Sequence, residues 1–300
     1  MNYYIGIELS ETYIKAGVVN ESLEIVGRTE INSFCNRSDD IFKVCVEACK
    51  AANISINDVD SIGIAENFGV KEVPIKKYIL EHIKKPVYFV NKDHAVAYGE
   101  FIAGAAKGAS DVVCITLGKR LGASVIIDGK ILTGRNHAGA KIGHMVIDVD
   151  GPQCTCGRKG CFEAFSSAAG LVNMIKEAVA LCPETLMAKH AERDGHFSPR
   201  HAFDAMRAGD VIGRKVVDKY IKYLAVGIAN VINIFQPDIL CIGGEICSEG
   251  DALFAPLKTL VNEQIITKML NKNTEITAVI LGENAVIIGA ALYKWREIKC

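Results

Sequence analysis

Three cysteines and a histidine lie close together near the middle of the chain. Cys154, Cys156 and Cys161 share one short segment, and His144 comes shortly before it. Three thiolates and an imidazole form a donor set that suits zinc, and four protein ligands leave no open coordination position for water. The glycines between these cysteines permit the tight turns that bring Cys161 back toward the metal. The segment therefore predicts a structural Zn²⁺ site, the alternative being free thiols in a loop.

The overall composition is that of a globular protein. The 300 residues are 50% hydrophobic, and 34 basic side chains balance 35 acidic ones. At roughly 150 residues per domain, this length predicts about two domains with sizeable cores. The net charge of −1 gives no general attraction to nucleic acid or to an anionic membrane. Because no apolar run reaches about 18 residues and no signal-peptide pattern is found, we expect a cytoplasmic protein without a membrane partner.

Short apolar strands alternate with helical segments over the first third of the chain. Three strands separated by brief breaks come first and indicate an antiparallel meander. The alternation of helices and strands that follows is typical of an α/β layer architecture. The expected strands cover residues 3–9, 13–19, 23–28, 59–65 and 87–90, and the expected helices cover 40–51, 75–83 and 95–106.

The opening pattern begins again in the second third of the chain. IELSETYIKAGVVN (7–20) matches ITLGKRLGASVIID (115–128) without a gap, at an offset of 108 residues (115 against 7). The repeat predicts duplicated α/β lobes that face each other across a cleft, although two meanders can also match by chance. Further strands are expected at 112–117, 123–127, 130–132, 238–243 and 275–280, and helices at 162–180 and 211–235. The expected lobes are 1–108, joined by a C-terminal helix at 284–298, and 109–283.

Several motifs resemble one known family. His144 follows a glycine, and CTCGRKGCFE (154–163) ends in Glu163. The chain also contains, in this order, the segments GIELSETYIKAGVVN, NVINIFQPDILCIGGEI and LGENAVIIGAALY. From about Ile5 to Leu292, it resembles the ROK family of bacterial sugar kinases and sugar-responsive repressors. The resemblance implies an α/β, duplicated actin-like ATPase (ribonuclease H-like) two-lobed fold with a central cleft. For kinase members it also implies phosphorylation of a hexose hydroxyl by ATP with Mg²⁺.

The position of the general base departs from the family pattern. Family kinases carry Asn-Asp before a small-residue helix that ends in Gly-Glu, and this chain has NKDHAVAYGE from Asn91 to Glu100. Counting back from Glu100 puts Lys92 at the place of the aspartate. An ammonium group donates protons and cannot accept one from a hydroxyl unless its pKa is strongly lowered. The alternatives are Asp93, which also suits a helix N-cap, and Glu100, which we expect to be a solvated helix residue.

The phosphate-binding loops also differ from the family. Gly-Gly-Thr of the first hairpin is Ser10-Glu11-Thr12 here, and Gly-Thr-Gly of the second is Gly118-Lys119-Arg120. The two basic residues of the second turn would bind an anion or would simply be solvated. Glu8 keeps a carboxylate where the family has a magnesium-associated aspartate. The resemblance thus implies the following nucleotide- or phosphate-binding residues: Glu8, Thr12, Gly118, Lys119, Gly243 and Gly244.

The sugar site is partly kept. The glutamate that precedes Gly-His in the family is Lys141 here, a reversal of charge. Asn91, His144 and Glu163 remain at positions that contact the sugar or the metal in relatives. The segment IAENFGVKEV (64–73) is much shorter than the usual sugar-contacting loop. We expect Asn91, Lys141, His144 and Glu163 to be the substrate-binding residues.

These departures predict a degenerate ROK member. We expect a non-catalytic protein that binds a sugar or an anionic sugar derivative between its lobes, as a homodimer built on the 162–180 region. The alternative is an active ATP-dependent hexose kinase, similar to glucokinases, with Asp93 as base; only then would ATP and Mg²⁺ be cofactors. Family repressors carry a winged helix-turn-helix before the first lobe. The first strand is expected at residues 3–9, so we expect no binding to nucleic acid.

Overall fold

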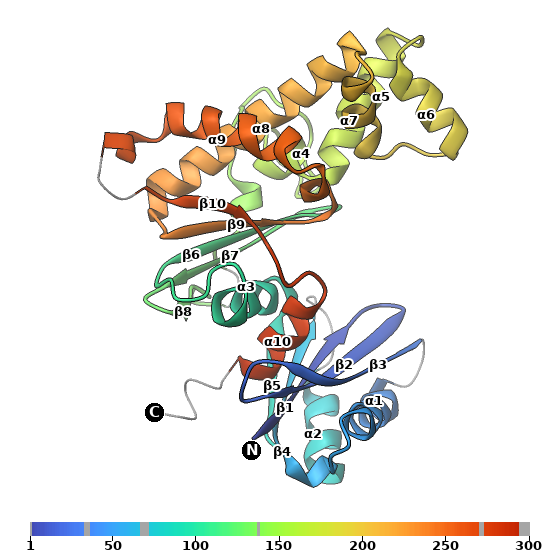
Figure 1. The fold of residues 1–300 in the computed structure, drawn as a ribbon, viewed down its shortest axis with the longest axis vertical. Helices are drawn as coiled ribbons and strands as arrows, with labels where there is room; N and C mark the ends of the chain where they lie inside the picture. The colour runs from blue at the N-terminus through green and yellow to red at the C-terminus, as the bar shows by residue number, and fades with distance from the viewer. Residues whose placement is uncertain (1, 33–36, 67–71, 137–138, 270–272, 294–300) are drawn as a thin grey trace. The chain divides into compact units, whose positions relative to one another are not determined.

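The computed structural model describes residues 2–32, 37–66, 72–136, 139–269 and 273–293 (Figure 1). These residues divide into two compact units: unit 1 spans residues 1–109 and 279–300, and unit 2 spans residues 110–278. The predicted first boundary lies one residue earlier. The prediction also assigns residues 279–283 to the second lobe, whereas they belong to unit 1.

Unit 1 is built on a five-stranded sheet with the order β3-β2-β1-β4-β5. The meander β1-β2-β3 is antiparallel, and β4 and β5 add to it in parallel. Alternating apolar side chains on these strands form the core with the helices. The strands are β1 (Tyr3–Leu9), β2 (Tyr13–Asn20), β3 (Ile25–Asn32), β4 (Val59–Glu66) and β5 (Val87–Asn91), and the helices are α1 (Arg37–Ala51), α2 (Glu72–His82), α3 (Lys92–Ala103) and α10 (Asn284–Leu292).

Helix α10 brings the end of the chain back into unit 1. It packs against α3, β1 and β4, and all its residues from Ala285 to Leu292 are buried. The predicted helix extends to residue 298, but the residues beyond Tyr293 lie outside the described part of the chain. A helix this apolar on every side is stable only inside a core.

Glu100, on α3, holds together the two segments that connect the units. Its side chain is completely buried, and its carboxylate accepts hydrogen bonds from the backbone N–H of Ala105 (2.8 Å), Leu281 (2.9 Å) and Ile280 (3.3 Å). Ala105 shortly precedes the passage into unit 2, and Ile280 and Leu281 follow the return. The expectation that Glu100 is solvated is therefore wrong, because these amides need a buried acceptor.

Replacing Glu100 with alanine is expected to lower the free energy of unfolding by about 3 kcal/mol, because each buried amide left without an acceptor costs roughly 1–3 kcal/mol. Urea unfolding followed by circular dichroism measures the change. Glu81→Ala, at an exposed position of α2, is the matched control and should change stability by less than about 0.5 kcal/mol. Equal stabilities of the two variants would show that Glu100 does not secure these connections.

Unit 2 repeats the strand arrangement of unit 1. Its sheet has the order β10-β9-β6-β7-β8, with β6-β7-β8 antiparallel and β9 and β10 parallel to β6. Helices cover the sheet and contribute most of a large apolar core. The strands are β6 (Val112–Leu117), β7 (Leu121–Ile127), β8 (Lys130–Ile131), β9 (Ile239–Gly243) and β10 (Glu275–Ala278), and the helices are α4 (Phe162–Ser166), α5 (Ala168–Leu181), α6 (Leu186–Asp194), α7 (Arg200–Arg207), α8 (Val211–Phe235) and α9 (Asp251–Gln264).

Two features of unit 2 differ from the sequence-based expectation. The helix expected at 162–180 is two helices, because Ser167 is extended (φ −77°, ψ 166°) and its hydroxyl caps α5 by accepting the N–H of Gly170. The paired hairpins also differ in length. Ile7 pairs with Ala16 but Ile115 pairs with Ala123, so the second strands are offset by 107 residues (123 against 16). The ungapped match is therefore wrong by one residue after the turn.

In the described ranges, no helix combines the length and the apolar composition needed to cross a membrane.

Candidate functional site

The four predicted metal ligands converge in unit 2. One donor atom each from His144, Cys154, Cys156 and Cys161 lies within 4.8 Å of all the others. The Sγ atoms of Cys156 and Cys161 are 3.6 Å apart, and Nδ1 of His144 is 3.8 Å from Sγ of Cys154. A tetrahedral zinc with Zn–S bonds of about 2.3 Å needs its sulfurs about 3.8 Å apart. The donor set and its spacing therefore fit zinc.

The loop that carries these ligands depends on Gly160. Its φ is +68°, and a Cβ there would overlap the carbonyl oxygen of Asp148. Its N–H donates to the carbonyl of Pro152 (2.9 Å), and its own carbonyl accepts from Ile147 (2.9 Å). Cys161 then pairs with Val146 in an isolated β-bridge. Only glycine combines this left-handed backbone with so close an approach, as the sequence predicts for the turn.

The thiols differ in how easily they ionise. A backbone hydrogen bond from Arg158 is the main cause that lowers the pKa of Cys156 to about 7. Burial raises the pKa of Cys161 to about 12. Metal ligation requires thiolates, so binding at this site must displace a proton from Cys161.

Glu163 lies directly beside this cluster. It is buried, and its Oε2 accepts the N–H of Leu121 on β7 (3.0 Å). Its Oε1 accepts the hydroxyl of Thr155 (3.0 Å) and lies 3.7 Å from Sγ of Cys154. Glu163, which the resemblance predicts to contact substrate, therefore connects the cysteine loop (residues 154–161) to the sheet.

In unit 1 the predicted base position holds an ion pair. Lys92, the first residue of α3, pairs its ammonium with the buried carboxylate of Glu8 on β1. The hydroxyl of Tyr13 donates to the same carboxylate oxygen (2.9 Å). Burial of Lys92 opposes its charge, but the hydrogen bond and the charge of Glu8 prevail and raise the pKa of Lys92 above its ordinary value. Lys92 is therefore a permanent cation, and Tyr13 is a partner that sequence reasoning did not find.

Asn91 and Asp93 flank this ion pair. The side chain of Asn91 accepts the N–H of Asp93 (2.9 Å), so Asn91 is the N-cap of α3. The suggestion that Asp93 is the cap is thus wrong by two residues. The cap fixes the orientation of the first turn of the helix, which carries Lys92.

The two predicted phosphate turns are exposed. In the first, Ser10 donates its N–H to the carbonyl of Tyr13 (3.0 Å), and Thr12 is exposed at the tip. In the second, the carbonyl of Gly118 accepts the N–H of Ala168 (2.9 Å), while Lys119 extends into solvent. The turns present side chains rather than rows of glycine amides.

Gly244 has a structural reason to be glycine. Its φ is +111°, and a Cβ would lie 2.5 Å from the carbonyl oxygen of Leu117 on β6. Its neighbour Gly243 is buried at the end of β9. The persistence of Gly244 is therefore explained by packing and does not by itself indicate a phosphate site. Lys141, which the resemblance puts at the place of the family's glutamate, is exposed just before the short helix that holds His144.

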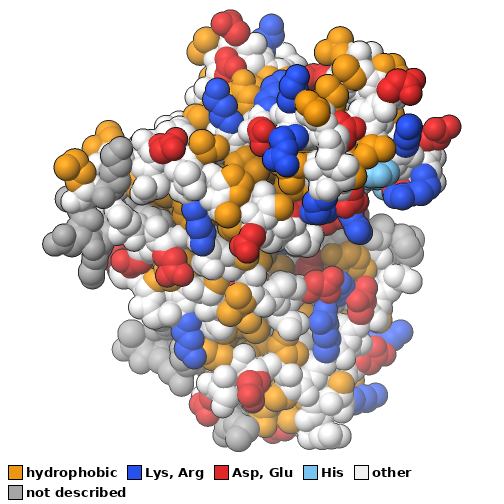
Figure 2. Space-filling model, turned by 45° about the horizontal axis from the view of Figure 1, so that its top comes forward, with side chains coloured by type: hydrophobic (Ala, Val, Ile, Leu, Met, Phe, Trp, Pro, Cys, Tyr) orange, Lys and Arg blue, Asp and Glu red, His pale blue; other side chains and the backbone are white. Residues whose placement is uncertain are grey.

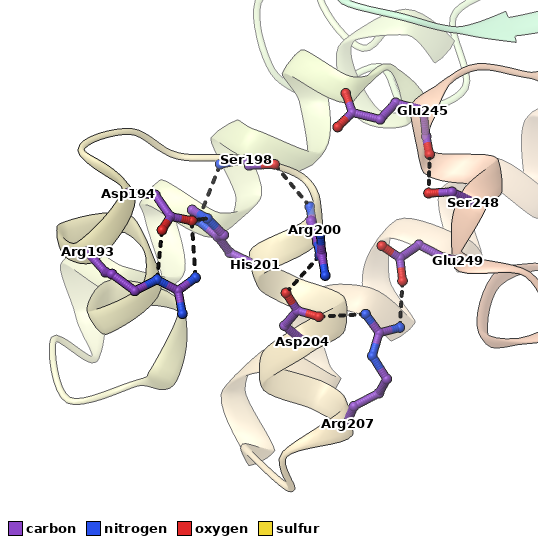
Figure 3. Close-up of polar contacts among 10 residues, drawn as sticks. All are labelled: Arg193, Asp194, Ser198, Arg200, His201, Asp204, Arg207, Glu245, Ser248 and Glu249. Carbon is purple, nitrogen blue, oxygen red and sulfur yellow. Dashed lines mark hydrogen bonds and ion pairs between the residues drawn. The ribbon is translucent and has the colours of Figure 1, made fainter.

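A charged cavity of about 510 Å³ follows Gly244, between α7 and the short helix Glu245–Glu249. Arg207 bridges Asp204 (2.7 Å) and Glu249 (2.5 Å), and Arg200 also pairs with Asp204 (3.2 Å) (Figure 3). Burial of Asp204 opposes its charge, but the two guanidinium groups prevail and lower its pKa. The sequence signal for this network was the position of Asp204 on α7, four residues after Arg200 and three before Arg207.

A second group of ion pairs lies next to this network. Asp194 pairs with Arg193 (2.7 Å) and with Nε2 of the buried His201 (3.0 Å) (Figure 3). Nδ1 of His201 accepts the N–H of Ser198 (3.3 Å). A ring nitrogen that accepts cannot carry the proton, so the Nε2 atom is the donor to Asp194. These contacts fix the connection between α6 and α7.

Comparison with known proteins places these features in a family. A model of the ROK family matches residues 4–296. The chain is 32% identical to the glucokinase of Thermotoga maritima, over 96% of this chain and 95% of that protein. A ROK-family glucokinase from Streptomyces griseus, solved in complex with glucose and AMPPNP, is 26% identical with a TM-score of 0.75, covering 96% of this chain and 98% of that one. A ROK hexokinase from Thermus thermophilus has a TM-score of 0.81 at 22% identity, with 99% of each chain covered.

These solved structures confirm the fold class that the sequence predicts. The described residues form two sheets of the same strand order, flanked by helices, and the structural neighbours are ROK sugar kinases. The fold is thus the α/β actin-like ATPase fold.

Proposed function

The chain belongs to the ROK family, and we propose that it is a sugar-kinase-like protein that does not transfer phosphate and instead binds a sugar or an anionic sugar derivative. The ion pair between Lys92 and Glu8 carries this proposal. Phosphoryl transfer to a hydroxyl needs a carboxylate that orients the nucleophile and a metal that neutralises the phosphates. In this chain the same ion pair affects both requirements.

The first requirement concerns the base. The family resemblance puts Lys92 at the position of the catalytic aspartate. Its pKa is raised, so at neutral pH it carries all its protons and has no lone pair to offer. An ammonium at this place can donate a hydrogen bond to a sugar hydroxyl, which supports binding without proton removal.

The second requirement concerns the metal. The resemblance puts Glu8 where kinases hold a magnesium-associated aspartate, but its carboxylate already pairs with Lys92 and accepts the hydroxyl of Tyr13. A divalent cation there would have to displace the ammonium or bind beside it, against Coulomb repulsion. This arrangement disfavours a magnesium site at Glu8.

The charge of the ligand depends on residues outside this pair. The charge of Lys92 is compensated by Glu8, so it adds no net attraction for an anion. Lys119 and Arg120 are exposed and form no ion pair among the described residues. The preference for an anionic sugar derivative therefore rests on the turn of unit 2.

The alternative is an active hexose kinase with Asp93 as base. It is favoured by the 32% identity to a glucokinase. Asp93 follows Lys92 in the first turn of α3. Its carboxylate would have to act as base in place of the family's aspartate, whose position the resemblance gives to Lys92. Under this alternative, ATP and Mg²⁺ would be cofactors.

An assay of ADP release with Mg²⁺ and a panel of hexoses separates these functions. We expect no hexose-dependent release of ADP above the background hydrolysis of ATP. The rate should therefore be at least about 10³-fold below the usual 1–100 s⁻¹ of kinases. Asp93→Asn is the matched variant, because it removes the only alternative carboxylate of this turn without changing its shape. Hexose-dependent turnover that Asp93→Asn abolishes would establish the kinase and refute the proposal.

We also propose that the cluster of His144 and the three cysteines binds structural zinc. Four protein donors complete a tetrahedral site, and the adjacent Glu163 is held by Leu121 and Thr155. The zinc would stabilise the loop and would not polarise a substrate, because no ligand position is open.

The homodimer remains a prediction. In the expected region, Phe162, Phe165 and Leu171 are buried in the core of unit 2. Leu181, at the end of α5, is 84% exposed. Light scattering coupled to size-exclusion chromatography measures the mass directly, and a mass near twice 32.5 kDa is the expected result.

A further inference from the structure

A cavity of about 350 Å³ lies in unit 2 beside the cysteine loop. Three lysines from three different elements line it: Lys119 in the turn between β6 and β7, Lys176 on α5 and Lys219 on α8. In Figure 2, basic and acidic side chains are interspersed over this unit. We propose that this cavity binds a phosphorylated small molecule of the size of a sugar phosphate.

The charges around the cavity favour an anion. Among the residues that the structure describes, none of the three lysine ammonium groups forms an ion pair, and the ammonium of Lys176 lies 5.8 Å from the ring centre of Phe197. Two carboxylates also line the cavity, those of Glu163 and Glu177. The three cations therefore exceed the two acids, and this excess of positive charge would attract a phosphate.

One of the two acids is already satisfied inside the protein. Both oxygens of Glu163 accept hydrogen bonds, from the N–H of Leu121 and from the hydroxyl of Thr155. Glu177 is exposed at the rim. The carboxylate at the rim would accept a ligand hydroxyl while the lysines contact the phosphate.

The rest of the lining suits a polyol. The side chains of Gln153 and Asn173 offer amide donors and acceptors, and Phe165 and Met174 supply an apolar wall. Small-molecule sites have volumes of about 300–1,000 Å³ and combine a few polar groups with apolar surface. The cavity is at the lower end of this range, which fits a phosphorylated monosaccharide.

This proposal rests on the proposed function, which assigns an anionic sugar derivative to the turn that carries Lys119, but it is tested on residues other than the Lys92–Glu8 pair. All lining residues of the cavity belong to unit 2, whereas the Lys92–Glu8 pair belongs to unit 1. Lys119 belongs to the turn that the family resemblance assigns to nucleotide phosphates. The geometry puts Lys119 at a cavity that Lys219 of α8 also lines.

Titration calorimetry with glucose 6-phosphate as the probe tests the proposal. Inorganic phosphate and glucose, titrated separately, show which part of the probe is recognised. We expect the zinc-loaded protein to bind the sugar phosphate and, more weakly, phosphate, and not to bind glucose. Lys119→Ala and Lys219→Ala should each weaken binding about tenfold, the usual effect of one charge-assisted hydrogen bond.

Two exposed lysines of unit 2 outside the cavity serve as controls. Lys222→Ala removes a charge from the same helix as Lys219, at a groove between α8 and α9, and Lys130→Ala removes one from β8. Both should keep the affinity within about twofold, because exposed charges at a distance are screened. Lys219→Arg should retain most of the binding.

Three results would overturn the proposal. The first is that neither phosphate probe binds. The second is that the control variants weaken binding as much as the lining variants, which would indicate general surface attraction. The third is that Lys92→Ala abolishes binding while Lys219→Ala does not, which would put the phosphate at the site of the proposed function. Finding no kinase activity would not decide any of these three binding results. The sugar-phosphate cavity and the loss of phosphate transfer can therefore be refuted separately.

Discussion

Replacing Cys161 with serine is expected to release zinc and to lower the melting temperature by about 10 °C. Cys161 is completely buried, directly precedes α4 as its N-cap residue and supplies one of four donors. Without the metal, the loop loses the bonds that cross-link His144 to the cysteines. A loss of about 4 kcal/mol at 2–4 °C per kcal/mol gives a shift of this size for a chain of this length.

Atomic absorption on the purified protein and a thermal scan of the same sample measure both effects. Cys182→Ser is the matched control, since Cys182 is a partly buried cysteine at the end of α5, outside the cluster. It should keep one zinc per chain and a nearly unchanged melting temperature. If the parent protein contains less than about half a zinc per chain, the structural site is refuted.

The second large effect concerns Lys92. Lys92→Asp is expected to make the melting temperature depend on Mg²⁺, because it would remove the ammonium from Glu8 and put a second carboxylate next to it. Without a cation, two close carboxylates repel each other, and the variant should be less stable than the parent by about 2 kcal/mol. Millimolar Mg²⁺ should restore much of this loss, because carboxylate oxygens are its preferred ligands.

Thermal scans with and without MgCl₂ measure this dependence. The parent protein should not respond, because its Glu8 is already neutralised. Lys76→Asp, at an exposed position of α2, makes the same change of charge away from Glu8 and should also show no response. A parent protein that Mg²⁺ stabilises as strongly as it does Lys92→Asp would contradict the role we assign to the ion pair.

Lys92→Asp also bears on the proposed function. Hexose phosphorylation gained by this variant would show that the base is the main missing element. Without such a gain, the altered turns at Ser10–Thr12 and Gly118–Arg120 would be further defects. Neither turn has the glycine run that the family resemblance implies for a phosphate-binding loop.

The sequence alone determined the features that are local along the chain. The metal ligands fall within one segment, and the glycine turn that returns Cys161 is fixed by backbone geometry that only Gly160 permits. The hairpins and α8 follow from periodicity and short turns, which act between near neighbours. The family assignment rests on the same local motifs, and the family match over residues 4–296 confirms it.

The tertiary structure decided which distant residues meet. Lys92 and Glu8 are 84 residues apart, and only the fold brings the ammonium of Lys92 to the buried carboxylate of Glu8. Glu100 and Leu281 are 181 residues apart, and only the return of the chain to unit 1 gives that carboxylate its amide partners. No local pattern encodes such contacts, because strand order and helix packing set them. The charge and accessibility of each functional side chain depend on these contacts, so they emerge only in the folded chain.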